Sequence, residues 1–307
     1  MHAARRGHDV ALWGSSYDSW AFQHLVADRQ HPLLPEHLPG SVRLCGPEEL
    51  EAAAEGAQFL VLGANSHGAR SLARLIRAHV EGALVAISIA KGLEPDTGKR
   101  MTEVYGEELA GVPIVTVGGP CLATELAEGL PTASVWAGSS VELATQAGQP
   151  FDGPTYQLTY TDDVIGVELC AMMKNVAAIG LGKPTGEDFK NAKAALFTKA
   201  AHEIVDLVAA CGGRSETAFG LAGIGDQLVT SLGGRNRLYG ELVGAGEPPA
   251  ETLRDLEARG LTVEGVDSTR DVARLAEDHN LHLPYHAAIH RVLSDGADPR
   301  DILEVLR

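Results

Sequence analysis

Residues 166–182 constrain the fold more than any other stretch of this 307-residue sequence. They read GVELCAMMKNVAAIGLG, an apolar helix pattern with Lys174 and Asn175 at its middle. An ammonium group among apolar side chains loses its hydration, and this loss lowers the pKa of a lysine. Lys174 can then exchange a proton near neutral pH; the alternative is a lysine whose stem packs on the core while its tip reaches water. Because Glu168 and Lys174 interrupt the apolar run, we expect a buried helix rather than a membrane span.

The net charge of −16 argues against a nucleic-acid partner, because binding phosphates requires clustered Lys and Arg. The four cysteines lie far apart, with no spacing typical of metal ligands. The first ten residues contain no apolar segment of a signal peptide. We therefore expect a reduced, cytoplasmic protein without metal or membrane insertion, and a homodimer is the default assembly.

In residues 1–160, near-continuous apolar strand patterns alternate with helix patterns, which indicates a parallel sheet covered on both faces. Gly7 is placed to end a short helix. The predicted strands cover 9–13, 58–63, 83–89, 114–118, 133–137 and 155–160, and the predicted helices cover 18–28, 66–80 and 99–109. In such a fold, ligands lie at the carboxyl ends of the strands.

From residue 161 onward the hydrophobic period is helical throughout. The predicted helices cover 163–181, 187–211, 214–231, 235–245, 249–259, 265–279, 283–294 and 298–306. We therefore predict a Rossmann-like α/β dinucleotide-binding domain over residues 1–160, followed by an all-helical substrate and catalytic domain over residues 161–307.

Five positions carry candidate chemistry, each with a plainer alternative. Lys91 follows a strand, so it either meets a phosphate or carbonyl oxygen or is a solvated loop lysine. Gly119 permits close approach of a ligand to the backbone or forms only a tight turn. Asp226 and Thr230, one helical turn apart, can hold a polyol and orient a lysine, although Asp226 can instead cap a helix. Arg235 follows two glycines at a helix start, which forms either an anion site or a charged turn.

Together with the sequence segments around them, these five positions closely resemble NAD(P)-dependent glycerol-3-phosphate dehydrogenase. The resemblance runs from about Arg6 to the C-terminus. It rests on AKGLEPDTG (90–98), GGPCLATELAEGLPTA (118–133), GVELCAMMKNVAAIG (166–180), NAKAALFTKA (191–200), GLAGIGDQLVTSLGGRNR (220–237) and VEGV (263–266). It implies an oxidoreductase that interconverts sn-glycerol 3-phosphate and dihydroxyacetone phosphate with NAD or NADP, for glycerophospholipid synthesis.

The resemblance also implies a role for each matching position. Lys174 resembles the base that removes the C2 hydroxyl proton and, in reverse, the acid that protonates the carbonyl oxygen. The implied substrate-binding residues are Lys91, Gly119, Cys121, Asn175, Asp226, Thr230 and the phosphate clamp Arg235 and Asn236. The implied cofactor-binding residues are Trp13, Ser15, Lys91, Ala123, Arg235 and Glu264.

Two departures from the family pattern bear on substrate and one on cofactor. Cys121 replaces the usual Ser or Thr, and the loop 182–191 reads GKPTGEDFKN instead of the usual glycine-rich form. Both leave open a dehydrogenase of a related phosphorylated polyol or hydroxy acid. After Trp13, the sequence Gly-Ser-Ser offers neither an acidic residue for a ribose 2′-hydroxyl nor an arginine for a 2′-phosphate. We expect a slight preference for NADP, because no acidic group there repels the extra phosphate.

A family member should begin with a strand and a G-x-G-x-x-[GA] turn before the helix that ends at Gly7, and the sequence shows neither. That strand is normally central, in the order 3-2-1-4-5-6, so we expect a slot with unpaired backbone on both sides. About five missing side chains at roughly 1.5–3 kcal/mol each amount to ~10 kcal/mol, comparable with a domain's stability of about 5–15 kcal/mol. Either Met1 is an internal methionine of a longer enzyme, which we favour because the substrate positions are all filled, or the chain is an inactive truncated relative or scaffold.

Overall fold

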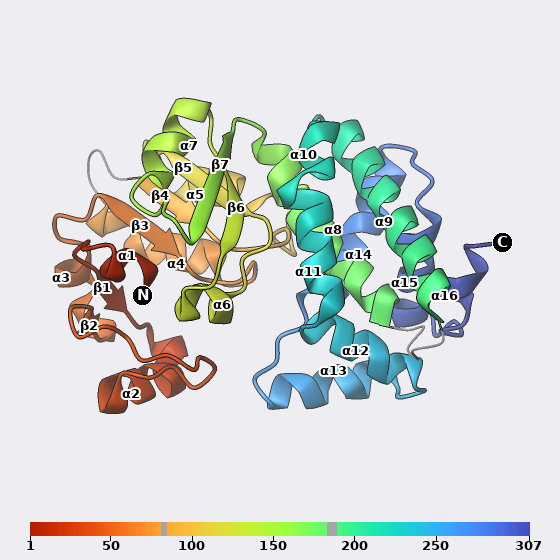
Figure 1. The fold of residues 1–307 in the computed structure, drawn as a ribbon, viewed down its shortest axis with the longest axis horizontal. Coiled ribbons are helices and arrows are strands. Elements are labelled where there is room, and N and C mark those ends of the chain that lie inside the picture. Colours follow the sequence, from red (N-terminus) through yellow and green to blue (C-terminus); the bar gives the residue numbers. More distant parts are fainter. Residues whose placement is uncertain (81–84, 183–188) are drawn as a thin grey trace. The chain divides into compact units, whose positions relative to one another are not determined.

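The computed structural model describes residues 1–80, 85–182 and 189–307, and in it the chain divides into two compact units (Figure 1). The first unit comprises residues 1–90, 102–117 and 121–162, and the second comprises residues 91–101, 118–120 and 163–307. Segments 91–101 and 118–120, expected in the α/β domain, thus belong to the helical unit. The predicted beginnings of a strand at 83 and of a helix at 187 lie outside the described residues.

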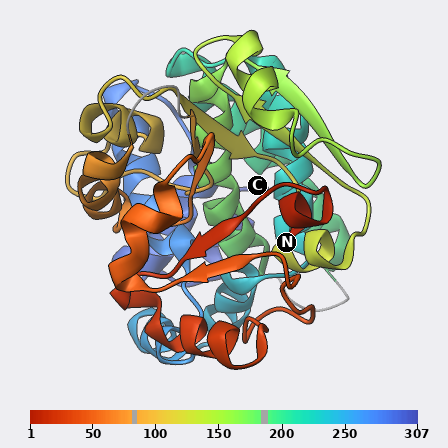
Figure 2. The same cartoon turned by 90° about the vertical axis from the view of Figure 1, so that its left-hand side faces the viewer.

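The parallel strands of the first unit form two separate sheets, which confirms the Rossmann-like α/β class (Figures 1 and 2). The larger sheet contains, in spatial order, β3 (Phe59–Leu62), β4 (Val85–Ser88), β5 (Ile114–Gly118), β6 (Thr132–Ala137) and β7 (Tyr156–Thr161). The smaller sheet pairs β1 (Ala11–Trp13) with β2 (Arg43–Cys45). Among the described strands β1 and β3 do not pair, so the sheet is interrupted where a slot is expected.

Burial of the strands falls toward this interruption. Every residue of β4 is buried, whereas Val61 in β3 is 49% exposed and no residue of β1 is fully buried. One core cluster of the unit lies on β4, β5, β6 and α7 and consists of Val85, Ile87, Val115, Trp136 and Ala147. The packing of this unit is therefore centred on one side of the interruption.

The helices of the first unit are α1 (His2–Arg5), α2 (Ser19–Asp28), α3 (Leu50–Ala54), α4 (Ala69–Ile76), α5 (Met101–Glu108), α6 (Ala123–Glu128) and α7 (Val141–Gly148). Gly7, with φ of 87°, follows α1 as predicted. We missed β2, α3, α6 and α7. β2 is only three residues long, too short for a period, but α7 has a readable signal because the Ser140 hydroxyl accepts from the Leu143 N–H and caps the helix.

The second unit is built of helices around α8 (Val164–Gly182) (Figure 1). The others are α9 (Lys190–Ala210), α10 (Ser215–Phe219), α11 (Asp226–Leu232), α12 (Arg235–Gly244), α13 (Pro249–Ala258), α14 (Glu264–Asp278), α15 (Pro284–Ser294) and α16 (Asp301–Glu304). α8 is the one helix of the described residues that is long and apolar enough to cross a membrane, and 89% of that stretch is buried inside the protein. A core helix has these properties, which agrees with the predicted buried helix.

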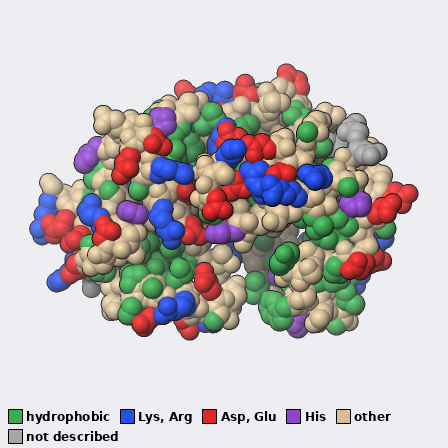
Figure 3. All heavy atoms as spheres, turned by 180° about the vertical axis from the view of Figure 1, so that it is seen from behind, with side chains coloured by type: hydrophobic (Ala, Val, Ile, Leu, Met, Phe, Trp, Pro, Cys, Tyr) green, Lys and Arg blue, Asp and Glu red, His purple; other side chains and the backbone are tan. Residues whose placement is uncertain are grey.

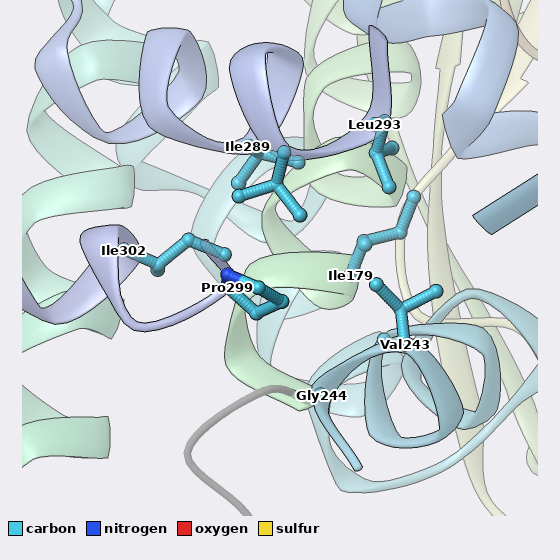
Figure 4. A pocket seen from close by; sticks show the side chains of 9 residues that line it. Ile179, Val243, Gly244, Ile289, Leu293, Pro299 and Ile302 are labelled. Atoms are coloured by element: carbon cyan, nitrogen blue, oxygen red, sulfur yellow. The ribbon is translucent and has the colours of Figure 1, made fainter. Parts of the chain in front are cut away.

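Two glycines permit a close crossing of α8 and α12. A Cβ atom at Gly240 would overlap the carbonyl oxygen of Ile179, and one at Gly182 would overlap that of Arg237. A small void lies nearby, with a volume of about 10 Å³. Figure 4 shows the aliphatic side chains of Ile179, Val243 and Ile289 that line it. This volume is no more than that of one water molecule, so this cavity is not a substrate site.

The predicted single helix over 214–231 is wrong. It consists of α10, a π-helical turn at Leu221–Gly225 and α11. A Cβ atom at Gly223 would overlap the carbonyl oxygen of Ala218, so the wide turn depends on a glycine there. Such turns often occur at functional sites.

Candidate functional site

Lys174 is buried in the middle of α8, with only 5% of the residue exposed. Its Nζ atom donates hydrogen bonds to Asp226 Oδ1 and to Thr230 Oγ1, both at 2.9 Å. Asp226 begins α11 and Thr230 lies one turn later, so the two acceptors share one face of that helix. The tip of the lysine therefore ends on a carboxylate and a hydroxyl, and the alternative of a tip in water is wrong.

Asp226 has a second carboxylate oxygen that is free to take another partner. The residue is helical and Gly225 holds the N-cap position, so the capping role is wrong. Oδ2 is buried and has no hydrogen-bond partner among the residues that the structure describes. The Lys91 Nζ atom lies 3.8 Å from it, beyond hydrogen-bond distance. Lys91 is therefore not a freely solvated loop lysine, and Oδ2 can still accept a hydrogen bond.

These surroundings lower the pKa of Lys174. Burial lowers its pKa to about 8, with the Lys91 ammonium as a second cause, and the carboxylate of Asp226 acts in the opposite direction. A lysine with a pKa near 8 is present in both protonation states close to neutral pH. It is thus suited to donate and accept a proton in one reaction cycle.

A chain of amide hydrogen bonds joins α8, α12 and α14 beside this lysine. Asn175 Nδ2 donates to Glu264 Oε2 at 3.2 Å, and Asn236 Nδ2 donates to Asn175 Oδ1 at 3.1 Å. The Gly265 N–H donates to Asn236 Oδ1 at 2.9 Å. Glu264 is thereby fixed at the start of α14, and the amide of Asn236 is largely committed to this network.

Two further predicted residues of the second unit lie at glycine turns. Gly119 has φ of 102°, a conformation that favours glycine. Arg235 is the exposed first residue of α12 and follows Gly234, which has φ of 94°. In the part of the chain that the structure describes, its guanidinium has no hydrogen-bond or ion-pair partner, so a guanidinium and a helix N-terminus together remain available for an anion.

The other predicted residues, Trp13, Ser15, Cys121 and Ala123, belong to the first unit. Trp13 ends β1, and its indole Nε1 donates to the Pro47 carbonyl at 3.3 Å. Ala123 is the first residue of α6. Cys121 is partly buried beside Tyr156, whose hydroxyl pKa is raised by burial and by the charge that Cys121 can carry.

Sequence comparison decides the family. The N-terminal profile of NAD-dependent glycerol-3-phosphate dehydrogenase matches residues 1–144, and the C-terminal profile matches residues 163–304. The glycerol-3-phosphate dehydrogenase [NAD(P)+] of Koribacter versatilis is 36% identical over 310 residues, 98% of this chain and 90% of that protein. That of Thermoanaerobacter sp. is 33% identical over 303 residues, 97% of this chain and 89% of that protein. The chain belongs to the NAD-dependent glycerol-3-phosphate dehydrogenase family.

Solved structures of glycerol-3-phosphate dehydrogenases have the same fold. The enzyme of Coxiella burnetii is 31% identical, with a TM-score of 0.88 over 99% of this chain and 93% of that one. That of Plasmodium falciparum is only 17% identical, yet its TM-score is 0.86 over 99% of this chain and 89% of that one. The second likeness shows the fold alone, and the fold thus persists while most side chains differ.

One premise about the cofactor of this family member is wrong. The expected preference for NADP rests on the lack of an acidic group after β1, but Asp18 Oδ2 accepts from Ser15 Oγ at 2.5 Å and from the Ser15 N–H at 3.2 Å. The sequence carries a signal that we missed: Ser15 and Asp18 form a capping box, with an acidic residue three positions after a serine. A negative group therefore stands beside one of the predicted cofactor residues.

The described ranges of this dehydrogenase family member contain no group of three or more His, Cys, Asp or Glu side chains placed to hold a metal ion. The four cysteines, all of them in the described ranges, form no disulfide bond. On the face shown in Figure 3, Lys and Arg side chains are interspersed with Asp and Glu and form no separate basic surface.

Proposed function

We propose that the chain interconverts sn-glycerol 3-phosphate and dihydroxyacetone phosphate with NAD(P)(H). The observation that carries this proposal is Lys174, a buried lysine with a pKa of about 8 held by Asp226 and Thr230 in a member of this family. We infer the substrate from the name that the relatives share, glycerol-3-phosphate dehydrogenase. Lys174 provides a proton-transfer group at the middle of α8.

Lys174 is the proposed proton-transfer residue. In the oxidation of the alcohol the neutral amine takes the C2 hydroxyl proton, and in the reduction of the ketone the ammonium gives a proton to the carbonyl oxygen. Positioned proton transfer of this kind contributes about 10²–10⁴ in rate. Asp226, through its unpartnered Oδ2, accepts a hydrogen bond from a substrate hydroxyl while Lys91 and Thr230 fix the orientation.

Arg235 and Asn236 are the proposed phosphate clamp, together with the backbone N–H groups that begin α12. A guanidinium binds phosphate with charge-assisted hydrogen bonds, and the positive end of the helix dipole adds to the attraction. Asn236 keeps one amide hydrogen beyond the bond that it makes to Asn175. Gly119 and Cys121 complete the proposed substrate residues.

The donor set also fits a nicotinamide dinucleotide. Glu264 offers a carboxylate oxygen that can accept from the carboxamide, and the unpaired guanidinium of Arg235 can meet a phosphate oxygen. Trp13, Ser15 and Ala123 are the proposed contributions of the first unit, and Lys91 contributes from the second. When bound, the nicotinamide supplies or accepts the hydride.

We further propose that the reaction takes place in the cytoplasm and supplies the backbone for glycerophospholipids. A homodimer is the proposed assembly. The proposed domain division is a dinucleotide-binding domain over residues 1–160 and a substrate and catalytic domain over residues 161–307.

The proposal is tested by dihydroxyacetone phosphate-dependent oxidation of NADH and NADPH. The comparison uses the unchanged chain, Lys174→Ala and the control Lys199→Ala, which alters a partly exposed lysine on α9. We expect the control to turn over as fast as the unchanged chain, and Lys174→Ala to lose about 10²-fold or more of that rate. Turnover only with another phosphorylated hydroxy compound would instead support the altered-substrate reading.

A further inference from the structure

Segment 91–101, which follows β4 in the chain, is folded back on itself within the second unit. Leu93 and Arg100 form an isolated antiparallel bridge. The Glu94 N–H donates to the Lys99 carbonyl at 2.8 Å, and the Gly98 N–H donates to the Glu94 carbonyl at 2.7 Å. The two ends of the segment are therefore close together, and displacement of one end carries the other with it.

The segment contacts the helices of its unit through a charged residue at each end. At one end, Lys91 Nζ lies 3.8 Å from Asp226 Oδ2. At the other end, Arg100 Nη1 lies 3.6 Å from Glu168 Oε2, and the carboxylate of Glu168 is almost completely buried in α8. Glu168 precedes Lys174 by six residues, or about 9 Å along the helix. One end of the segment thus pairs with the helix that carries Lys174, and the other end lies beside Asp226, which accepts a hydrogen bond from Lys174.

A glycine in the same segment permits a third contact. Gly98 has φ of 67°, and a Cβ atom there would overlap the guanidinium of Arg274 on α14. Arg274 itself is paired with Asp271 at 3.3 Å. The segment therefore contacts α14 as well as α8, while its tip at residues 95–97 is exposed.

We propose that Arg100 and Glu168 are positioning residues, whose ion pair holds segment 91–101 on α8 so that the Lys91 ammonium stays beside Asp226 and Lys174. This proposal rests on the proposed function, in which Lys91 binds substrate. A carboxylate costs free energy when it is buried without a cation beside it. Arg100 supplies such a cation to Glu168. It belongs to segment 91–101, which also carries the proposed substrate-binding residue Lys91.

If the Arg100–Glu168 ion pair positions Lys91, its loss changes the pKa of Lys174; if the pair only stabilises the fold, that pKa stays the same. The charged and titratable groups that face this lysine are Lys91 from the segment, Asp226 from α11 and Cys170 one turn earlier on α8. The other helices packed on α8 carry Glu216, Arg235, Glu264, and the buried pair Glu203 and His286. Of these groups, Lys91 lowers the pKa of Lys174 and Asp226 raises it. Release of the segment moves Lys91 away, so the pKa of Lys174 rises toward its ordinary value.

The test compares Arg100→Gln and Glu168→Gln with the conservative variant Arg100→Lys. Arg259→Gln is the control, because it removes an exposed ion pair with Asp255 on α13 of the same unit. For each variant, glycerol 3-phosphate oxidation is measured from pH 6 to 10. We expect Arg100→Gln and Glu168→Gln to raise the KM at least severalfold and to move the midpoint of kcat/KM upward by about 0.5–1 pH unit. Arg100→Lys restores both values, and the control changes neither.

A second readout does not require turnover. The pH dependence of acetylation of Lys174 by a trace of acetic anhydride, followed by mass spectrometry, reports its pKa directly. An inactive unchanged chain whose Lys174 titration still shifts upward in Arg100→Gln would contradict the proposed function and support the positioning role. Unchanged Lys174 titration and KM in both glutamine variants, with only a lower melting temperature, would overturn the positioning role.

Discussion

The two units differ in how completely their interiors are enclosed. In the second unit, Lys174, Asn175 and Asn236 are buried and each is hydrogen-bonded to a partner from another helix. In the first unit, the sheet is interrupted between β1 and β3, and Val61 on β3 is 49% exposed. The geometry of the proposed proton-transfer residue is therefore fixed inside one unit, whereas the proposed cofactor side depends on strands whose apolar faces are only partly covered.

The same substitution, Gly→Ala, should have opposite effects in the two units. At Gly240 the new methyl group would overlap the Ile179 carbonyl on α8, so Gly240→Ala should destabilise the second unit by about 3 kcal/mol. At Gly106, inside α5, nothing lies within 4 Å of the added atom. Gly106→Ala should therefore stabilise the first unit by about 0.5–1 kcal/mol.

Urea unfolding distinguishes these two outcomes. Far-UV ellipticity follows the helical unit, and fluorescence follows the first unit, because Trp13, Trp20 and Trp136 all belong to it. A Gly240→Ala variant as stable as the unchanged chain would show that α8 and α12 do not cross closely.

A Val→Ala pair tests the uneven burial of the sheet. Val115 on β5 is completely buried, so Val115→Ala should lower the free energy of unfolding by about 2 kcal/mol. Val61→Ala should cost about half of that or less, because much of this side chain already contacts water. The difference is read from the fluorescence midpoint in urea. Equal losses at the two positions would mean that β3 is covered as fully as β5, and would remove the contrast.

The smallest expected effect concerns the cofactor. Asp18→Ser removes the carboxylate beside Ser15, so the affinity for NADPH relative to NADH should rise about fivefold, or ~1 kcal/mol. Quenching of tryptophan fluorescence by each nucleotide measures the ratio. The control is Asp28→Ser, which removes an exposed aspartate that also accepts a backbone N–H, from Gln30. An unchanged ratio in Asp18→Ser would place the 2′-phosphate away from this carboxylate.

Strongly periodic segments of the fold could be predicted from the sequence. The strand 114–118 is observed with the predicted bounds, and the helix predicted over 163–181 is observed as Val164–Gly182. The split of 214–231 could not be predicted, because the π-helical turn is determined by the contact of Gly223 with Ala218. Hydrophobic period reports which face of a segment is buried but not the hydrogen-bond register within it.

The candidate site, like the fold, could be predicted from the sequence only in part. The spacing of Asp226 and Thr230 predicts a shared helix face that can orient a lysine, but it does not identify the lysine, because the contacts with Lys174 span 52 and 56 residues. Arg100 was not predicted, since its partner Glu168 lies 68 positions away. The one available signal was an acidic residue in an apolar helix, which requires a cation from elsewhere in the chain.

The central claim is that Lys174 transfers the proton, and the pH dependence of turnover tests it most directly. Oxidation of glycerol 3-phosphate requires the neutral amine, so its kcat/KM should rise through pH 8 and level off above it. Reduction of dihydroxyacetone phosphate requires the ammonium and should fall over the same range. In Lys174→Met, which keeps the volume of the side chain, both rates should drop by about 10²–10⁴ and lose this midpoint. A Lys174→Met enzyme with the midpoint and most of the rate intact would contradict the account.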